Sequence, residues 1–400
     1  MIFLTSLYEK NEKKDVDIME EPDYKFISNI NINQSKSEIG FKTLVDGFDS
    51  LLYVIPKYQR KFIWSQDQVQ SLAISLLRGL PIPPVYVYRN ENGQLEILDG
   101  QQRMISLFLY YKGKYFKNKT KNYMNLESIM TDLRLNNDDV SFEALLEEQN
   151  LLKSVTYELE CFDENMNKQI LNINYDNLKK DMRRRLDFTP ISIIEIKVDS
   201  ESYKHRILYT VFQNLNRGGT QLKNQEVRNG AYQSEFYDML HDVNNNNLKW
   251  REIYGPKHIH SRDVELLLRF CSVEYYFKLI NNEIKINNYN GSYPSLLNDF
   301  SDEAVKFDSN KILEYRHNLE TFINRVETGG KIPTLLLESL YLASIYVEGN
   351  YKITQDFCKS ILNDKNYSNI IDKSPSIKIK VKERFDYVYK RLFNYVEYGS

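Results

Sequence analysis

Residues 99–103, Asp-Gly-Gln-Gln-Arg, combine side chains that are well suited to holding a phosphate group. The apolar run before them predicts a strand over 95–98, and the apolar spacing after them predicts a helix. A helix N-terminus has unpaired backbone N–H groups and a partial positive charge, and both attract an anion. Gly100 lets a phosphate approach the backbone, Arg103 can clamp it through two N–H groups, and Asp99 can hold a divalent cation or position a water. The structural alternative is a plain strand–helix turn, with Asp99 as the helix cap and Arg103 in a surface ion pair.

Two other stretches have compositions that suit nucleotide binding. Residues 56–64 (PKYQRKFIW) interleave three cations with three aromatic side chains, which suits phosphate contact and base stacking. The same residues would also suit an ordinary exposed edge with solvated cations. Residues 212–220 (FQNLNRGGT) place a glycine pair at the end of one predicted helix and Thr220 before the next. This stretch matches neither a P-loop nor a dinucleotide fingerprint, and a helix–turn–helix corner is its alternative.

The elements expected around these stretches give an α+β protein with a small mixed α/β module. Asn92-Gly93 predicts a hairpin between two of its strands. The expected helices of the module are 39–48 and 69–77, and the expected strands are 51–55, 85–88, 95–98 and 191–196. Residues 112–187 are expected to be a largely helical insert, and almost everything beyond residue 203 has helical periodicity.

The expected organisation of the chain has three parts. A polar, charge-alternating arm covers 1–37, the mixed α/β module with its insert covers 38–240 and a helical domain covers 241–400. The asparagine run 244–247 is the expected linker. Sparse Gly and Pro together with long amphipathic patterns, such as the one over 379–396, predict the helical domain.

The composition excludes several classes of protein. With 53 Lys+Arg against 55 Asp+Glu, the formal charge is −2, so any contact with nucleic acid must come from local patches. Three scattered cysteines exclude a disulfide scaffold and a cysteine-based zinc module, and they fit a reducing compartment. There is no apolar stretch of about 18 residues and no secretory pattern at the N-terminus, so we expect a cytoplasmic protein without a membrane partner.

Three basic runs in the sequence could contact nucleic-acid phosphates, and each could equally be a solvated surface. The run that we select as the DNA-binding candidate consists of Lys179, Lys180, Arg183, Arg184 and Arg185. The other two runs are Lys112, Lys114, Lys117, Lys119 and Lys121, and Lys378, Lys380, Lys382 and Arg384.

Four sequence motifs, taken in order, resemble the N-terminal domain of GmrSD-type modification-dependent restriction proteins. That family belongs to the ParB/sulfiredoxin-like nucleotide-binding superfamily. The motifs are IPKYQRKFIW, GLPIPPVYVY, LDGQQRMISLF and VFQNLNRGGTQLKNQEVRNGAY, and they span roughly residues 38–240. The resemblance implies nucleotide binding and hydrolysis at the DGQQR turn, in proteins that defend bacteria against phage with modified DNA.

The resemblance also implies a role for each matching residue. Asp99, Gln102 and Arg103 would be the catalytic residues, with Gly100 and Gln101 beside them on the phosphate side of the pocket. The facing wall would be lined by Tyr58, Gln59 and Arg60, the pocket would be closed by Asn216, Gly218, Gly219 and Thr220, and it would be braced by Glu226 and Arg228.

The chain departs from the full restriction proteins after this domain. Those relatives carry a C-terminal HNH-type nuclease, which needs clustered histidines and further metal ligands. Only His258 and His260 cluster here, and an amphipathic pattern follows them, so ordinary loop histidines explain the pair better than a metal site. The polypeptide is therefore not expected to cut DNA by itself.

Together these features predict a defence protein that binds and hydrolyses a nucleoside triphosphate of undetermined base with Mg²⁺. Asp99 is the expected metal ligand. The expected partners are DNA, a separate nuclease or another defence-system subunit, and a second copy of the chain. Two alternatives remain open: a non-catalytic nucleotide-gated clamp, and a DNA-binding regulator in which the DGQQR turn holds a DNA phosphate.

Overall fold

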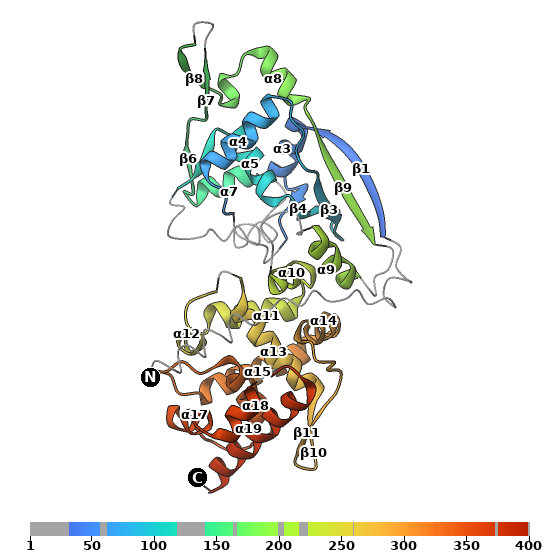
Figure 1. The fold of residues 1–400 in the computed structure, drawn as a ribbon. Helices are drawn as coiled ribbons and strands as arrows, with labels where there is room; N and C mark the ends of the chain where they lie inside the picture. The colour runs from blue at the N-terminus through green and yellow to red at the C-terminus, as the bar shows by residue number, and fades with distance from the viewer. Residues whose placement is uncertain are drawn as a thin grey trace. The chain divides into compact units, whose positions relative to one another are not determined.

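The computed structural model describes residues 32–56, 62–117, 141–162, 166–198, 204–215, 223–258, 260–372 and 375–398 (Figure 1). These residues fall into two compact units. The sheet unit comprises Ile32–Asn245 and Pro256–Glu265, and the helical unit comprises Asn246–Gly255 and Leu266–Ser400. Within the described ranges, no helix combines the length and the apolar character needed to cross a bilayer.

The sheet unit is built on a mixed five-stranded sheet in the order β1-β9-β3-β4-β2. Its strands are β1 (Ile32–Gly40), β2 (Tyr53–Val54), β3 (Val85–Arg89), β4 (Leu95–Asp99) and β9 (Pro190–Val198). The antiparallel hairpin of β3 and β4 turns at Gly93, while β2 runs parallel to β4 and β9 runs parallel to β3. Because β2 and β4 are parallel, the chain after Val54 and the chain after Asp99 leave the sheet at the same edge.

The central helix of this unit is α5 (Gln101–Tyr111), which is buried on almost all sides, as expected for a helix that is apolar around its circumference. Phe108 of α5 packs against Phe48 of α3 (Phe41–Asp49) with ring centroids 5.7 Å apart. Phe142 of α7 (Phe142–Glu148) completes an aromatic triad, 5.1 Å from Phe48. Burial of each such side chain contributes about 1.5–3 kcal/mol. This core fixes the start of α5, and therefore the DGQQR turn.

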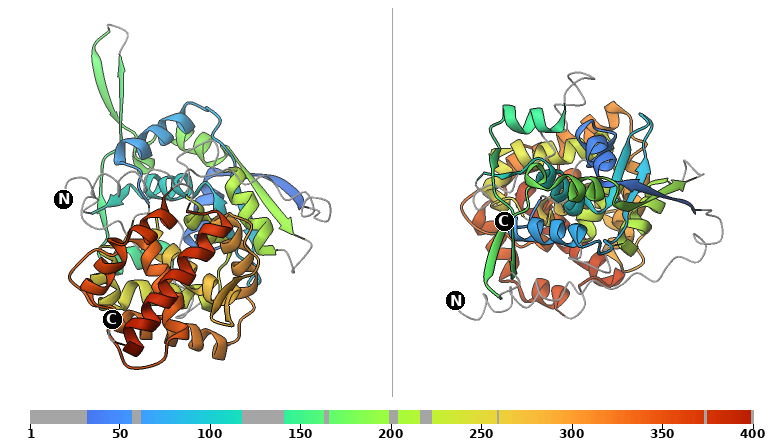
Figure 2. Two further views of the ribbon diagram at one scale, coloured as in Figure 1. Left: turned by 60° about the horizontal axis from the view of Figure 1, so that its bottom comes forward. Right: turned by 90° about the horizontal axis from the view of Figure 1, so that it is seen from above.

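Residues 112–187 differ from the largely helical insert that periodicity predicts. The described part of this segment contains helices α7, η1 (Tyr175–Asn177) and α8 (Lys180–Asp187), and strands β5 (Lys114–Phe116), β6 (Leu152–Ser154), β7 (Glu158–Phe162) and β8 (Lys168–Asn172). The strands form two antiparallel pairs, and the β7–β8 hairpin projects from the unit (Figure 2). The sequence does not predict these strands because they are short. In addition, every side chain of β8 is exposed, so this strand has no alternating apolar pattern.

The N-terminal boundary also differs from the expectation. Residues 32–37, which the sequence assigns to the polar arm, lie in β1, which pairs antiparallel with β9 from Ile32–Val198 to Gly40–Pro190. As an edge strand, β1 is exposed over its first seven residues and so has no apolar face. Residues 1–31 lie outside the described part of the chain.

The asparagine run 244–247 contains the boundary between the two units, which falls between Asn245 and Asn246, as expected for a linker, but its backbone is largely helical. Helix α11 (Glu235–Asn246) continues through most of the run. Asn247 then caps α12 (Leu248–Tyr254), because its side chain accepts a hydrogen bond from the Trp250 backbone N–H. Asparagine favours loops in general, but here it satisfies the orphan donors of a helix N-terminus.

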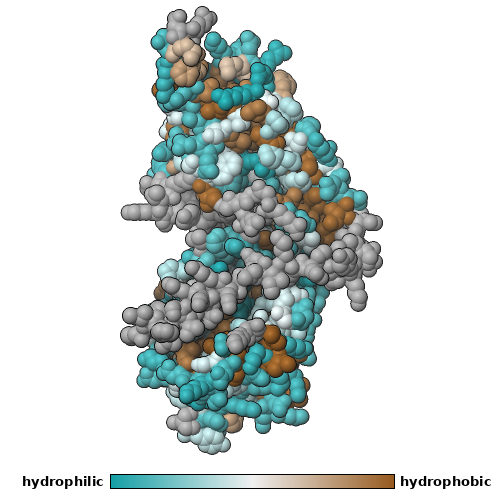
Figure 3. All heavy atoms as spheres, in the orientation of Figure 1, coloured by the Kyte–Doolittle hydropathy of each residue, from teal (hydrophilic) through white to brown (hydrophobic). Residues whose placement is uncertain are grey.

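The helical unit confirms the mainly helical C-terminal half, and with the mixed sheet it confirms the predicted α+β class. Its elements after α12 are α13 (Arg262–Tyr276, whose first residues belong to the sheet unit), β10 (Phe277–Ile280), β11 (Glu283–Ile286), α14 (Tyr293–Ala304), α15 (Ser309–Arg325), α16 (Thr334–Tyr346), α17 (Gln355–Leu362), α18 (Lys365–Ile371) and α19 (Lys378–Tyr398). Helix α16 is apolar around most of its circumference, and most of its own residues are buried. Hydrophilic side chains cover most of the visible face of this unit (Figure 3).

Candidate functional site

The DGQQR turn begins where β4 ends. Gly100 has a φ of +101°, is the N-cap of α5 and provides no side-chain cap for the helix. A Cβ at this position would lie 3.0 Å from Cγ2 of Val85 and 3.1 Å from Nη2 of Arg103, so both the backbone angle and the space require glycine. The first turn of α5 is therefore left without a side-chain cap, which is the arrangement that anion-binding helix termini use.

Arg103 and Asp99 form an ion pair across this turn. Nη2 of Arg103 donates to Oδ2 of Asp99 at 2.8 Å and to the carbonyl oxygen of Pro84 at 3.0 Å. Asp99 therefore orients Arg103. It does not cap the helix, so the alternative in which Asp99 is the helix cap is excluded. The Asp99 side chain is 34% exposed and that of Arg103 is 16% exposed, so the pair is open to solvent on one side.

A second nitrogen of Arg103 is unsatisfied. Its Nε is buried and has no hydrogen-bond partner among the described residues. Leaving such a donor unpaired costs about 1–3 kcal/mol, and more for a charged group. The guanidinium is thus fixed by one nitrogen and keeps donor capacity for a further acceptor.

Gln102 and Gln101 have different environments. The side-chain oxygen of Gln102 accepts hydrogen bonds from the backbone N–H groups of Ile63 at 2.9 Å and Trp64 at 3.3 Å. Gln102 thereby ties the start of α5 to the chain that follows residues 57–61. Gln101 is buried, with 8% of its surface exposed.

The segment held by Gln102 is also fixed from its other side. Tyr115 of β5 donates its hydroxyl hydrogen to the carbonyl oxygen of Trp64 at 2.7 Å. Burial raises the pKa of Tyr115 to about 12, so the hydroxyl stays protonated and remains a donor at neutral pH. Phe62 packs edge-on against Phe116, with ring centroids 5.4 Å apart. The wall expected to face the DGQQR turn therefore has a rigid anchor at its C-terminal end.

The structure describes one side of the predicted pocket. Tyr58, Gln59 and Arg60 lie in 57–61, and Asn216, Gly218, Gly219 and Thr220 lie in 216–222, both of which are outside the described residues. Their roles remain predictions. The described chain resumes at Phe62 after the segment 57–61 and at Lys223 after the segment 216–222.

Glu226 and Arg228 lie on α10 (Asn224–Ala231), which begins shortly after the segment 216–222. Oε2 of Glu226 accepts a hydrogen bond from the Lys223 backbone N–H at 2.8 Å and lies 3.1 Å from Nδ1 of His260. Arg228 is fully buried, and its Nη1 donates to Gln225 at 3.1 Å and to Oε2 of Glu265 at 3.3 Å. Both side chains therefore hold α10 to the segment that leads into α13.

His258 and His260 take part in this network. The backbone N–H of His260 donates to Nδ1 of His258 at 3.1 Å, and burial lowers the pKa of His258. Among the described residues, no group of three or more metal-binding side chains occurs here or elsewhere. The contact between His260 and Glu226 joins residues 34 apart, which no local sequence pattern could predict.

The DNA-binding candidates do not share one environment. Lys179, Lys180, Arg184 and Arg185 are exposed on and before α8, whereas Arg183 is partly buried. The guanidinium of Arg183 lies over the Tyr175 ring, 5.2 Å from its centroid, and donates to the Asp176 carbonyl oxygen. Arg183 is therefore a packing residue.

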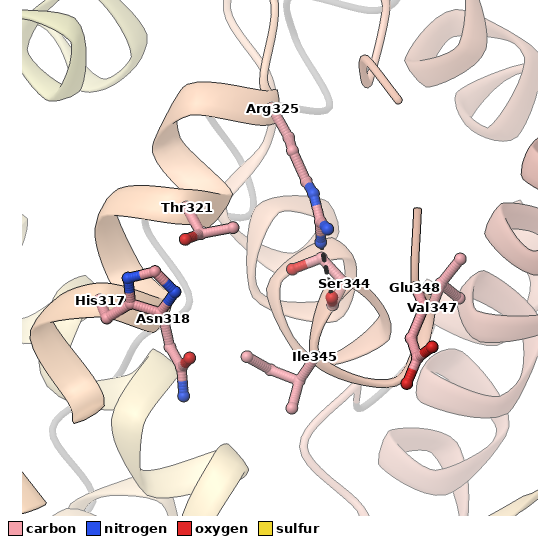
Figure 4. Close-up of a pocket in the computed structure, with 8 residues that line it drawn as sticks. All are labelled: His317, Asn318, Thr321, Arg325, Ser344, Ile345, Val347 and Glu348. Carbon is pink, nitrogen blue, oxygen red and sulfur yellow. Dashed lines mark hydrogen bonds between the residues drawn. The ribbon is translucent and has the colours of Figure 1, made fainter. Parts of the chain in front are cut away.

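A cavity of about 180 Å³ in the helical unit does not offer a comparable site (Figure 4). Its most basic lining residue is Arg325, which donates to the carbonyl oxygens of Ser344 at 2.8 Å and Gly349 at 3.0 Å. The guanidinium also lies 4.4 Å from the centroid of the Tyr351 ring. The hydrogen-bond donors of Arg325 therefore bind backbone carbonyl oxygens at and just after the C-terminal end of α16.

Residues 41–233 match the family model described as GmrSD restriction endonuclease, N-terminal domain. This match is consistent with a GmrSD N-terminal domain over this part of the chain, as the order of its motifs predicts. The match includes the DGQQR turn, the segments 57–61 and 216–222 and α10, and it points to a restriction-type phage-defence protein. No curated protein matches the chain.

Proposed function

We propose that this protein is a Mg²⁺-dependent nucleoside triphosphatase of a restriction-type defence system, with its phosphate site at the DGQQR turn. The observation that carries the proposal is Arg103, whose guanidinium is fixed by Asp99 and Pro84 but keeps an unsatisfied buried Nε beside an uncapped helix N-terminus. The match to the GmrSD N-terminal domain supports it. The same protein would engage DNA or a nuclease partner.

The residues of the turn would divide the work. The backbone N–H groups of Gln101 and Gln102 would hold phosphate oxygens, because Gly100 lets the phosphate come close. Arg103 would neutralise charge that develops on the transferred group. Gln102 would act as a positioning residue, since its side-chain oxygen accepts hydrogen bonds from the backbone N–H groups of Ile63 and Trp64, which follow the expected wall in the chain.

The described residues fit a magnesium ion of the usual nucleotide-bound kind. Mg²⁺ keeps several waters and is commonly held by one or two carboxylates together with substrate phosphates. Asp99 supplies one carboxylate, which is part exposed and lies next to the uncapped turn. When bound there, the ion would neutralise phosphate charge.

Phosphate release from ATP, GTP, CTP and UTP with Mg²⁺, with and without DNA, tests the proposal. The Arg103→Ala variant should lose turnover and keep its fold. Arg89→Ala is the matched control, because it removes another arginine of the same sheet whose partner, Glu195, lies away from the turn. Turnover that survives in Arg103→Ala would refute the assignment. Tight nucleotide binding without turnover in the wild type would instead support the nucleotide-gated clamp.

A further inference from the structure

The three basic runs of the sequence have different partners in the structure. In the first run, Lys112 binds Asp49 at 2.8 Å and Glu143 at 2.5 Å, and Lys114 binds Glu147 at 2.7 Å. Lys119 and Lys121 lie outside the described residues. Lys112 and Lys114 therefore tie elements of the sheet unit together and are neutralised there, whereas Lys117 donates to the neutral side chain of Asn150 and keeps its charge.

The third run, on α19, is neutralised in a similar way. Lys380 pairs with Glu383 at 3.0 Å, and Lys382 pairs with Asp386 at 2.7 Å. Arg384 is buried against Glu338. The charges of Lys380, Lys382 and Arg384 are therefore neutralised by carboxylates within the helical unit.

The run around α8 is different, because its exposed cations have no acidic partner in the part of the chain that the structure describes. Lys179, Lys180 and Arg184 are exposed, and none of them has an ion pair with a described residue. Arg185 donates to the Leu77 carbonyl oxygen at 3.0 Å, which leaves its charge uncompensated. The neighbouring Arg78, the C-cap of α4 (Gln66–Leu77), is also exposed. This set of five residues is the α8 surface.

The positions of these cations do not favour the helix itself. Lys179 is the N-cap of α8 but makes no side-chain cap, and Lys180 is the first residue of the helix, where the helix dipole disfavours positive charge. Lys180 and Arg184 are also like charges four residues apart, which destabilises a helix. Only the placement of Arg184 and Arg185 in the last turn suits the dipole. Local stability therefore does not explain the run as a whole.

We propose that the α8 surface binds the phosphate backbone of duplex DNA. Uncompensated lysine and arginine side chains bind phosphates through charge and without reading sequence, so this surface would hold DNA while any recognition of bases takes place elsewhere. DNA is favoured over other polyanions because the sheet unit matches a restriction-type domain. The inference deepens the DNA engagement in the proposed function and rests on it.

The test is binding of a labelled DNA duplex to the full chain by fluorescence anisotropy across a series of salt concentrations. In the variant Lys179→Gln/Lys180→Gln/Arg184→Gln, the slope of log affinity against log salt should become less steep by about 2.7, since each lost phosphate contact contributes roughly 0.9. Affinity at low salt should fall by at least about tenfold.

The matched control is Lys306→Gln/Lys311→Gln/Lys380→Gln, which removes the same charge from lysines that pair with Glu303, Glu314 and Glu383. The control should bind DNA as the wild type does. An unchanged slope in the α8 variant, an equal loss in the control, or displacement of the duplex by polyglutamate as effectively as by unlabelled duplex would each overturn the proposal.

A single substitution separates DNA binding from folding. Lys179→Ser should supply the side-chain cap that α8 lacks, so the melting temperature should stay the same or rise while DNA affinity falls. A loss of affinity that accompanies a lower melting temperature, or unchanged affinity, would count against the surface.

Phosphate release distinguishes this inference from the proposed function. The α8 variant should retain turnover measured without DNA, and Arg103→Ala should lose turnover but retain the salt-dependent binding of DNA. If Arg103→Ala keeps its turnover while the α8 variant loses DNA binding, the phosphate site is wrong and the DNA surface stands.

Discussion

The two units each contain an arginine bound to a carboxylate, and the two pairs differ in their access to solvent. In the sheet unit, Arg103 and Asp99 are 16% and 34% exposed at the end of a strand. In the helical unit, Arg384 and Glu338 are 1% and 0% exposed. Glu338 also accepts two hydrogen bonds from Arg269, at 3.2 and 3.0 Å, and one from Tyr293 at 3.0 Å.

An arginine–carboxylate pair needs further features before it can form a binding site for a ligand. Both arginines keep a buried Nε without a partner, so that feature alone does not define a binding site. Glu338 is saturated by donors inside a helical core, whereas Asp99 and Arg103 lie beside an uncapped helix start and open to solvent. Access to solvent and an adjacent helix N-terminus without a side-chain cap separate the candidate phosphate site from a structural network.

The largest expected effect is the loss of the buried carboxylate. Glu338→Gln should destabilise the helical unit by about 3–5 kcal/mol, because it leaves the charges of Arg269 and Arg384 buried without an anion. Urea unfolding measures this loss. Glu314→Gln, which removes an exposed partner of Lys311, should change stability by less than about 1 kcal/mol. Equal effects of the two substitutions would refute the assignment of a closed network.

Loss of the arginine in the exposed pair should lower activity strongly and change stability little. Arg103→Ala should lower the rate of phosphate release by about 10²–10³-fold, the usual range for removal of one transition-state donor. Its free energy of unfolding should change by no more than about 1 kcal/mol, since the Asp99 carboxylate that remains is part exposed and can be hydrated. Single-turnover kinetics and urea unfolding of the same preparation measure both quantities. A stability loss as large as that of Glu338→Gln would make Arg103 a structural residue.

Substitution of Gly100 tests the turn that opens the site. Gly100→Ala should destabilise the sheet unit by about 1–3 kcal/mol, from the positive φ and from the close approach to Val85 and Arg103. Gly93→Ala is the matched control, because Gly93 also has a positive φ, +78°, but an added Cβ would meet no atom within 4 Å. The difference between the two variants in thermal unfolding measures the steric part. No difference would show that the turn relaxes freely.

The smallest expected effect is a pH dependence of the stability of the helical unit. Burial raises the pKa of Glu274, so the native state binds this proton more tightly than the unfolded chain. The associated stability is present below the pKa of the unfolded chain, near 4.5, and is lost as the pH rises through the raised native pKa. The melting-temperature advantage of wild type over Glu274→Gln should therefore shrink from acid to neutral pH. An advantage that grows with pH would contradict the direction of the shift.

The elements that position the candidate site could be predicted from the sequence. The pattern over 95–104 gives the strand, the turn and the helix, and the structure has β4 and α5 there. The hairpin at Asn92-Gly93 and the helix that became α3 also follow local rules. Strands β1, β7 and β8 could not be predicted, because their side chains are largely exposed and their pairing partners supply the reason for the extended backbone.

The DGQQR turn and the match to the GmrSD N-terminal domain could be predicted before folding was considered, because both depend on residue types at fixed local spacing. The partner of each charged side chain, in contrast, depends on the folded arrangement of the chain. Lys112 is neutralised by Asp49, a residue 63 positions away, and Glu226 meets His260 across 34 positions, whereas Lys179, Lys180 and Arg184 meet no acidic side chain among the described residues. Charge compensation acts between side chains that folding brings together, so a basic run in a sequence becomes a structural tie or a free surface only when the chain has folded.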